Sequence, residues 1–168
     1  MPETRDKLPD LLGENLRLVF VGTAASHRSA AEGAYYAHPG NRFWRTLHEV
    51  SLTPRLYAPS EFRELLKLGI GFTDMSKQGS GMDHNVAHHE FDVSRFTAAM
   101  RKYRPRVIAF TSKKAASVFY NRPTQKIGLG LQEPQPDFPY AFVLPSPSGA
   151  ATRYWDIAPW RELAHFLK

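Results

Sequence analysis

The sequence predicts an α/β protein, a three-layer αβα sandwich whose central sheet is mainly parallel. Three apolar runs, at 17–22, 106–111 and 140–144, have the length of buried strands, and segments with helical periodicity separate them. Strands that alternate with helices are typical of parallel sheets covered on both faces. At 168 residues, with 42% hydrophobic residues, the chain is expected to form a single domain, 1–168, with residues 1–14 as a flexible N-terminal segment.

Local signals mark where each expected element begins and ends. The first strand stops at Gly22, which favours a tight turn, and Pro105 separates a helix from the strand at 106–111. The other expected elements are a helix at 41–51, a helix capped by Ser60 and stopped by Gly69, a short strand at 69–74, a glycine-rich loop at 77–85, a helix at 92–103 capped by Asp92, a helix at 112–120, and a C-terminal helix at 154–167.

Small and polar residues follow each expected strand. In open α/β sheets, ligands bind beyond the carboxyl ends of the strands. We therefore expect a binding site on one rim of the sheet, where four segments meet: 22–29, 73–85, 112–114 and 146–153.

The charge balance favours nucleic acid as a partner. Twenty-two Lys and Arg against 16 Asp and Glu give a net charge of +6, and a basic surface attracts phosphate backbones. The absence of cysteine excludes disulfides and cysteine-based metal sites. The polar start of the chain and the lack of a long apolar run predict a cytoplasmic protein without a membrane span.

Two motifs resemble those of a known family. The segment GTAASHRSAAEGAYYAHPGNRFW, 22–44, resembles the first motif region of the mismatch-specific uracil/thymine DNA glycosylases, and LPSPSGAA, 144–151, resembles their second motif. The middle segment GIGFTDMSKQGSGMD and the paired tyrosines Tyr35 and Tyr36 resemble the hypoxanthine-DNA glycosylase branch of the same uracil-DNA glycosylase superfamily. The resemblance implies a monomeric, monofunctional DNA glycosylase of base excision repair that acts on uracil and other deaminated bases without a cofactor.

Two residues depart from the mismatch-specific branch. Ala24 stands where that branch has its catalytic Asn, and Ser146 stands where its second motif begins with Asn. Either another side chain activates water, or the protein binds damaged bases or abasic sites without cutting. A small-molecule hydrolase, such as a nucleoside hydrolase, is a third interpretation, which the basic charge fits poorly.

Base excision requires a nucleotide flipped into a closed pocket. In the turn 22–26, backbone N–H groups can bind the base oxygens, and Gly22 permits close approach. Ala24 leaves room for a broader range of bases. Tyr36 is the candidate for stacking on the base, with a core position as its alternative. Thr23 and Ser29 are candidates for further hydrogen bonds, whereas Phe43 and Trp44 are expected in the core.

Two side chains are candidates for the chemistry. The resemblance implies that Asn41 holds water through its carboxamide oxygen, and the alternative is that it caps the following helix. Asp74, after a predicted strand, is a candidate general base or a support for the developing cation, and its alternative is a turn or cap. Asp83 and His84 lie in the same loop and are weaker candidates.

The late loop is expected to contact DNA. Ser146, Ser148 and Gly149 suit phosphate contacts, while relatives insert a wedge at the position of Ala150 and Ala151. Alanine is a poor wedge, so a bulkier side chain would have to help. Two cations are further candidates for DNA contacts, Arg153 and Lys113, the latter beside Lys114.

Neither a metal nor a nucleotide cofactor is expected. His84 and His88 have the spacing of one helical turn, but no third ligand accompanies them in a known metal motif. The sequence also contains neither a GxGxxG nor a GxxxxGK[ST] motif.

Overall fold

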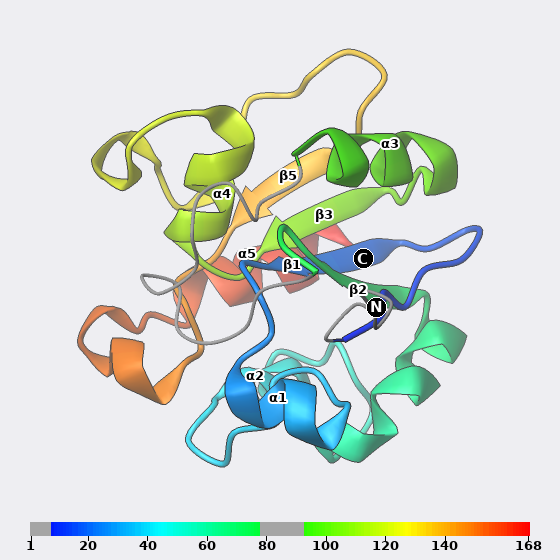
Figure 1. Ribbon diagram of the computed structural model, residues 1–168, viewed down its shortest axis with the longest axis vertical. Helices are drawn as coiled ribbons and strands as arrows, with labels where there is room; N and C mark the ends of the chain where they lie inside the picture. The colour runs from blue at the N-terminus through cyan, green and yellow to red at the C-terminus, as the bar shows by residue number, and fades with distance from the viewer. Residues whose placement is uncertain (1–7, 78–92) are drawn as a thin grey trace, which may run out of the picture.

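The computed structural model describes residues 8–77 and 93–168. Helices cover both faces of one sheet, and α3 and α4 lie on the opposite side from α1 and α2 (Figure 1). The strands are β1 (Leu18–Gly22), β2 (Ile70–Asp74), β3 (Val107–Phe110), β4 (Gly130–Leu131) and β5 (Tyr140–Val143). The α-helices are α1 (His27–Glu32), α2 (Phe43–Glu49), α3 (Val93–Tyr103), α4 (Lys113–Tyr120) and α5 (Ala158–Phe166); the 3-10 helices are η1 (Pro59–Leu68), η4 (Thr124–Lys126) and η5 (Gly149–Tyr154).

The sheet has the strand order β2-β1-β3-β5-β4. β1 pairs in parallel with β2 and with β3, and β3 pairs in parallel with β5; β4 joins the edge in antiparallel orientation. The expected three-layer αβα fold with a mainly parallel sheet is therefore confirmed. β1 lies in the interior of the sheet, so its carboxyl end is flanked by the ends of β2 and β3.

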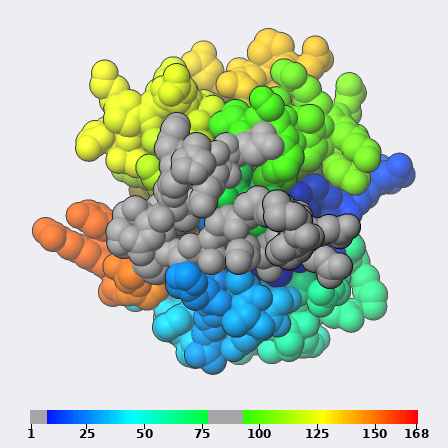
Figure 2. Space-filling view, in the orientation of Figure 1, coloured from blue at the N-terminus to red at the C-terminus, as the bar shows by residue number. Residues whose placement is uncertain are grey.

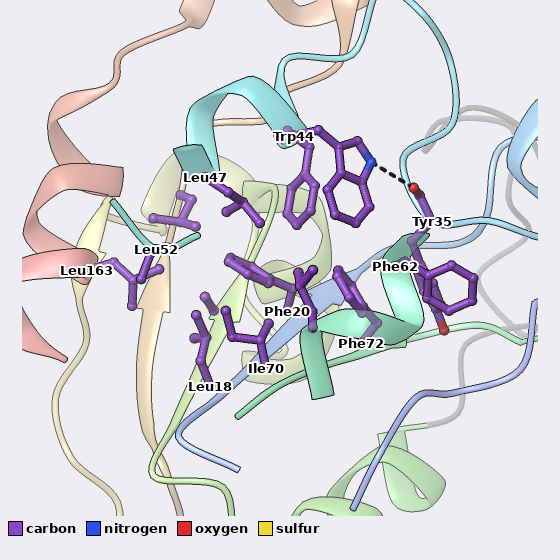
Figure 3. Close-up of a cluster of buried hydrophobic side chains, with 14 of the residues drawn as sticks. Leu18, Phe20, Tyr35, Trp44, Leu47, Leu52, Phe62, Ile70, Phe72 and Leu163 are labelled. Atoms are coloured by element: carbon purple, nitrogen blue, oxygen red, sulfur yellow. Dashed lines mark hydrogen bonds between the residues drawn. The ribbon is translucent and has the colours of Figure 1, made fainter. Parts of the chain in front are cut away.

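Alternate residues of β1 supply two separate cores. Leu18 and Phe20 face one layer, with side chains of α2, η1 and α5, whereas Val19 and Val21 face the other, with side chains of α3 and α4. A strand buried on both faces must be apolar at every position, which explains the run LVFV. Figure 3 shows the first core, where Phe20 lies among Leu18, Leu47 and Phe72.

The bounds of three helices differ from the prediction, and α2 covers only 43–49 of the expected 41–51. The helix expected from Ser60 is the 3-10 helix η1, which begins at Pro59; the Glu61 carboxylate accepts a hydrogen bond from the Ala58 N–H at 2.9 Å, so Ser60 is not the cap. The C-terminal helix begins at Ala158 rather than at 154, because residues 149–154 form η5. The short elements α1, β4 and η4 were not predicted. Asp92 and most of the glycine-rich loop lie outside the described residues.

Residues 8–11 are bound to the sheet, which corrects the expectation of a flexible segment over 1–14. Leu8 is 1% exposed, and Leu11 forms an antiparallel bridge with Phe72. The Tyr35 hydroxyl donates a hydrogen bond to the Pro9 carbonyl at 2.9 Å. Residues 1–7 are outside the described part of the chain. Within residues 8–77 and 93–168, no helix is long and apolar enough to cross a membrane.

Candidate active site

A pocket of about 550 Å³ opens at the carboxyl ends of the strands. Its walls come from the turn after β1, the end of β2, the residues after β3, the segment 35–41 and the loop after β5. The volume lies within the range of small-molecule sites, roughly 300–1,000 Å³. Twelve residues singled out from the sequence line it: Gly22, Thr23, Ala24, Ser29, Tyr36, Asn41, Asp74, Ser146, Ser148, Gly149, Ala150 and Ala151.

The turn after β1 is attached to the residues after β2. The Met75 N–H donates to the Gly22 carbonyl at 2.8 Å, and the Ser76 N–H donates to the Thr23 carbonyl at 2.9 Å. A Cβ atom at position 22 would collide with Oδ1 of Asp74. Glycine is therefore required at this position for the carboxylate to approach the turn.

Paired hydroxyl groups connect the pocket walls. The hydroxyls of Thr23 and Ser112 are 3.2 Å apart, and those of Tyr36 and Thr111 are 2.9 Å apart. The Ser29 hydroxyl accepts a hydrogen bond from the Ala37 N–H at 3.0 Å, so it holds the backbone of the segment 35–41. The Thr111 hydroxyl donates to the Val21 carbonyl at 3.3 Å, whereas the Ser29 hydroxyl, which accepts from Ala37, can still donate to a ligand.

Tyr36 is held in an uncommon backbone conformation. Its φ is 52°, in the left-handed region that a bulky residue seldom adopts. Its ring lies on Phe43, with 4.0 Å between ring centroids and 15° between planes. Phe43 therefore covers one face of the ring, and Tyr36 also lines the pocket. Such strained residues concentrate at functional sites.

Phe43 and Trp44 belong to the core, as expected. Phe43 is 0% exposed and Trp44 is 6% exposed. The Trp44 indole N–H donates to the carbonyl of Tyr35 at 3.1 Å, as the dashed line in Figure 3 shows. This contact fixes the backbone immediately before Tyr36.

Asn41, which directly precedes the N-cap residue of α2, Arg42, lines the pocket. Its Oδ1 accepts a hydrogen bond from the Phe43 N–H at 2.9 Å. The side chain thus binds an N–H at the start of α2, as the capping alternative expected, but Arg42 holds the N-cap position itself. A carboxamide oxygen has a second lone pair, so capping and water binding are compatible.

Asp74 is a buried carboxylate at the end of β2. It is 4% exposed, and its Oδ2 lies 3.2 Å from Nζ of Lys77. Burial raises the pKa of the Asp74 carboxyl above its ordinary value, although the Lys77 ammonium acts in the opposite direction. Raised carboxyl pKa values occur in catalytic sites and in buried ion pairs alike, and Asp74 combines such an ion pair with a position in the pocket wall.

The loop after β5 packs against the segment 35–41. The Ser148 N–H donates to the Ser146 hydroxyl at 3.3 Å, and the Ser148 hydroxyl accepts from the Ala150 N–H at 3.2 Å. The hydroxyls of Ser146 and Ser148 therefore bind backbone N–H groups of the loop to which both residues belong. Ala150 is exposed and Ala151 is partly buried at the edge of the pocket.

Arg153 and Lys113 lie outside the pocket lining. Both are exposed, Arg153 in η5 and Lys113 at the start of α4. The Arg153 guanidinium lies 5.8 Å from the centroid of the Tyr154 ring, and Tyr154 is 74% exposed. In Figure 2 the orange segment that contains η5 stands out at one side of the molecule.

The pocket also contains residues that the sequence did not single out. They are Leu8, Ala25, Ser26, Tyr35, His38, Thr111, Ser112 and Pro147. Ala25, Ser26, Ser112 and Pro147 lie in segments expected at the rim, and Tyr35 and His38 lie in the first recognised motif, so the sequence carried no signal only for Leu8 and Thr111. Within residues 8–77 and 93–168, no group of three or more His, Asp or Glu side chains is placed to hold a metal ion. Asp83, His84 and His88 lie outside that part of the chain.

Comparison with known proteins identifies the family. The family model of the uracil DNA glycosylase superfamily matches residues 9–166, so the chain belongs to this superfamily. Its structure is similar to the solution NMR structure of a candidate uracil DNA glycosylase from Methanosarcina acetivorans, with a TM-score of 0.65, 25% sequence identity and coverage of 98% of each chain. Membership supports a DNA glycosylase role with DNA as the partner.

Proposed function

We propose that the protein is a monofunctional DNA glycosylase that flips uracil, and other deaminated bases, out of DNA and removes them by hydrolysis. The observation that carries the proposal is one pocket in which an aromatic ring, an amide and a buried carboxylate meet, lined by Tyr36, Asn41 and Asp74. An extrahelical base needs a face to stack on, and its excision needs a placed water.

The proposed chemistry uses the two polar side chains together. The bond between C1′ and the base nitrogen breaks with its electron pair leaving on the base. Water held by Oδ1 of Asn41 adds to C1′ and loses a proton. Either Asp74 accepts that proton and the base anion is later protonated by solvent, or Asp74 supports the cationic sugar through its charge and the departing base anion takes the proton. Hydrogen-bond donors in the turn 22–26 stabilise the departing base anion, because fixed donors act strongly in a pocket that excludes water.

The loop after β5 is proposed to grip the DNA. Ser146, Ser148 and Gly149 would contact phosphates, with Arg153 and Lys113 as cations beside them. Ala150 and Ala151 are too small to fill the space left by a flipped base. Tyr154, 74% exposed in the same 3-10 helix, is the large side chain that we propose for this task.

A second candidate function is binding to damaged bases or abasic sites without excision. Ala24 has no polar group, and the Ser146 hydroxyl already accepts a hydrogen bond from its own loop. Both observations favour a pocket that recognises a base but lacks the usual activating group. This interpretation predicts affinity for damaged DNA without product.

The test uses oligonucleotides that carry uracil, hypoxanthine or xanthine, as single strands and as duplexes. Incubation is followed by alkali, which breaks the strand at an abasic site. Strand breaks that depend on the protein support excision, and a shifted band without breaks supports binding alone. The double variant Asn41→Ala with Asp74→Asn is the control, and full excision by that variant would contradict the proposed chemistry.

A further inference from the structure

A buried lysine lies behind the pocket wall. Lys77 is 4% exposed, and its Nζ lies 3.0 Å from Oδ1 of Asp10, 3.2 Å from Oδ2 of Asp74 and 3.1 Å from the hydroxyl of Tyr35. An ammonium group has three N–H donors, so these three acceptors can satisfy it completely. Burial of a charge is costly unless its partners are fixed in this way.

Asp10 reaches this lysine from the N-terminal segment. The Thr73 hydroxyl donates to Oδ1 of Asp10 at 2.7 Å, and Nη1 of Arg95 lies 3.4 Å from Oδ2 of Asp10. The hydroxyl of Tyr35 accepts from Lys77 and donates to the Pro9 carbonyl. Residues of the segment 8–11 therefore bind the partners of the Asp74 carboxylate, although Asp74 lies more than sixty residues later in the sequence.

The two oxygens of Asp74 have different surroundings. Oδ2 is bound to Lys77, whereas Oδ1 is turned toward Gly22 at the pocket wall, where any larger residue would collide with it. A carboxylate held by one oxygen cannot rotate freely, so the position of the other oxygen is fixed as well. This is the arrangement that a group needs if it must meet a substrate in one orientation.

We propose that Lys77 and Asp10 are positioning residues for Asp74, which hold its carboxylate at the pocket wall with Oδ2 bound to Lys77 and Oδ1 against Gly22. The proposal rests on the proposed function, in which Asp74 acts on water or on the sugar cation. Asp10 shares the Lys77 ammonium with Asp74, and its negative charge raises the pKa of the Asp74 carboxyl.

The groups that face Asp74 act on it in opposite directions. Lys77 and Arg95 favour the charged carboxylate, whereas Asp10 disfavours it; the Arg95 guanidinium also donates to the Asp74 carbonyl. The hydroxyls of Tyr35 and Tyr36 also lie on this side, and His38 lines the same pocket as Asp74. Removing Lys77 and removing Asp10 should therefore move the titration of Asp74 in opposite directions.

The test compares the wild-type protein with Lys77→Met and Asp10→Asn, and uses Lys67→Met as the control at an exposed lysine. The carboxyl ¹³C signal of Asp74 is followed by NMR across pH. We expect a midpoint about one pH unit higher in Lys77→Met, a lower midpoint in Asp10→Asn, and no change in the control. The acidic limb of the single-turnover excision rate should move in the same directions.

Common midpoints in all four proteins, or shifts of Lys77→Met and Asp10→Asn in the same direction, would overturn the proposal. If Lys77→Met does not fold, Asp10→Asn and Lys77→Arg still test it, because the first must lower the midpoint and the second must leave it near the wild-type value. If the Asp74 midpoints shift in opposite directions but the protein excises no base, the effect of Lys77 and Asp10 on Asp74 is supported and the proposed glycosylase function is overturned. Common midpoints in a protein that excises uracil would overturn the role of Lys77 and Asp10 alone.

Discussion

The backbone N–H of Arg42 donates a hydrogen bond to the carbonyl of Pro147, with 2.8 Å between nitrogen and oxygen. The Arg42 guanidinium also donates to the Thr152 hydroxyl at 3.1 Å. One residue of the segment NRFW thus holds both the start and the end of the loop after β5. The two motifs of the superfamily form a single pocket because these contacts join them.

Gly149 provides the first prediction about this junction. A Cβ atom at 149 would lie 3.0 Å from the carbonyl oxygen of Gly40, which is closer than ordinary contact. Gly149→Ala should separate the two loops by a fraction of an ångström and lower the excision rate by about tenfold, since misplacement strongly affects reacting groups. Single-turnover assays with a uracil oligonucleotide measure the rate. Gly128→Ala, where a Cβ meets open space, is the control, and equal rates in both variants would contradict the prediction.

The hydroxyl pair of Tyr36 and Thr111 provides the second prediction. Tyr36→Phe keeps the ring on Phe43 but removes a hydrogen bond of 2.9 Å, so the free energy of unfolding should fall by about 1 kcal/mol. Urea denaturation of Tyr36→Phe, Thr111→Val and the double variant gives the coupling between the two hydroxyls. Purely additive losses would show that the pair contributes nothing.

Tyr36→Leu should in addition weaken binding of damaged DNA by about tenfold, because it removes the stacking face.

Apolar patterning made much of the fold predictable. The run LVFV and the strand at 107–110 are apolar at every position, which is a local property of the sequence. β4 has only two residues, and one of them is exposed, so no pattern could mark it. α1 has six residues, of which Ser29 alone is buried, and it leaves no apolar stripe.

Pocket residues that belong to a recognisable motif could be predicted. Residues brought to the pocket by contacts between distant parts of the sequence could not. Asn41 and Tyr36 lie in a recognisable segment. Lys77, in contrast, follows a strand like many surface lysines, and only Asp10, Tyr35 and Asp74 together explain its burial. The sequence does not indicate which residues meet across such separations, so the packing of residues 8–11 was missed for the same reason.

Asn41 provides the third prediction, which separates capping from chemistry. Serine is a good helix cap but is too short to hold water at the position of the carboxamide. Asn41→Ser should keep the wild-type free energy of unfolding yet lower the excision rate by about a hundredfold. Asn41→Ala should lose the rate and also about 1 kcal/mol of stability. Undiminished excision by Asn41→Ser would restrict this residue to capping α2.

Asp74 provides the fourth prediction, on stability against pH. Burial raises the pKa of its carboxyl in the folded protein above the unfolded value, so the folded state binds the proton more tightly. The contribution of Asp74 to stability should therefore increase as the pH falls through the raised pKa toward the ordinary range of an aspartate, and decrease as the pH rises. Urea denaturation of the wild-type protein and Asp74→Asn at several pH values measures this difference. A difference that does not change with pH would contradict the raised pKa.

Ala24 provides the last prediction, on the range of bases. The residue lines the pocket, and its methyl group leaves space that an asparagine would fill. Ala24→Asn should narrow the substrate range, with excision of hypoxanthine falling about tenfold relative to uracil, because a small change in pocket volume discriminates by roughly that factor. Ala31→Asn, at an exposed position of α1, is the matched control. The ratio of the two excision rates isolates the effect on base choice from any loss of folded protein, so an unchanged ratio in Ala24→Asn would show that the methyl group does not set the range.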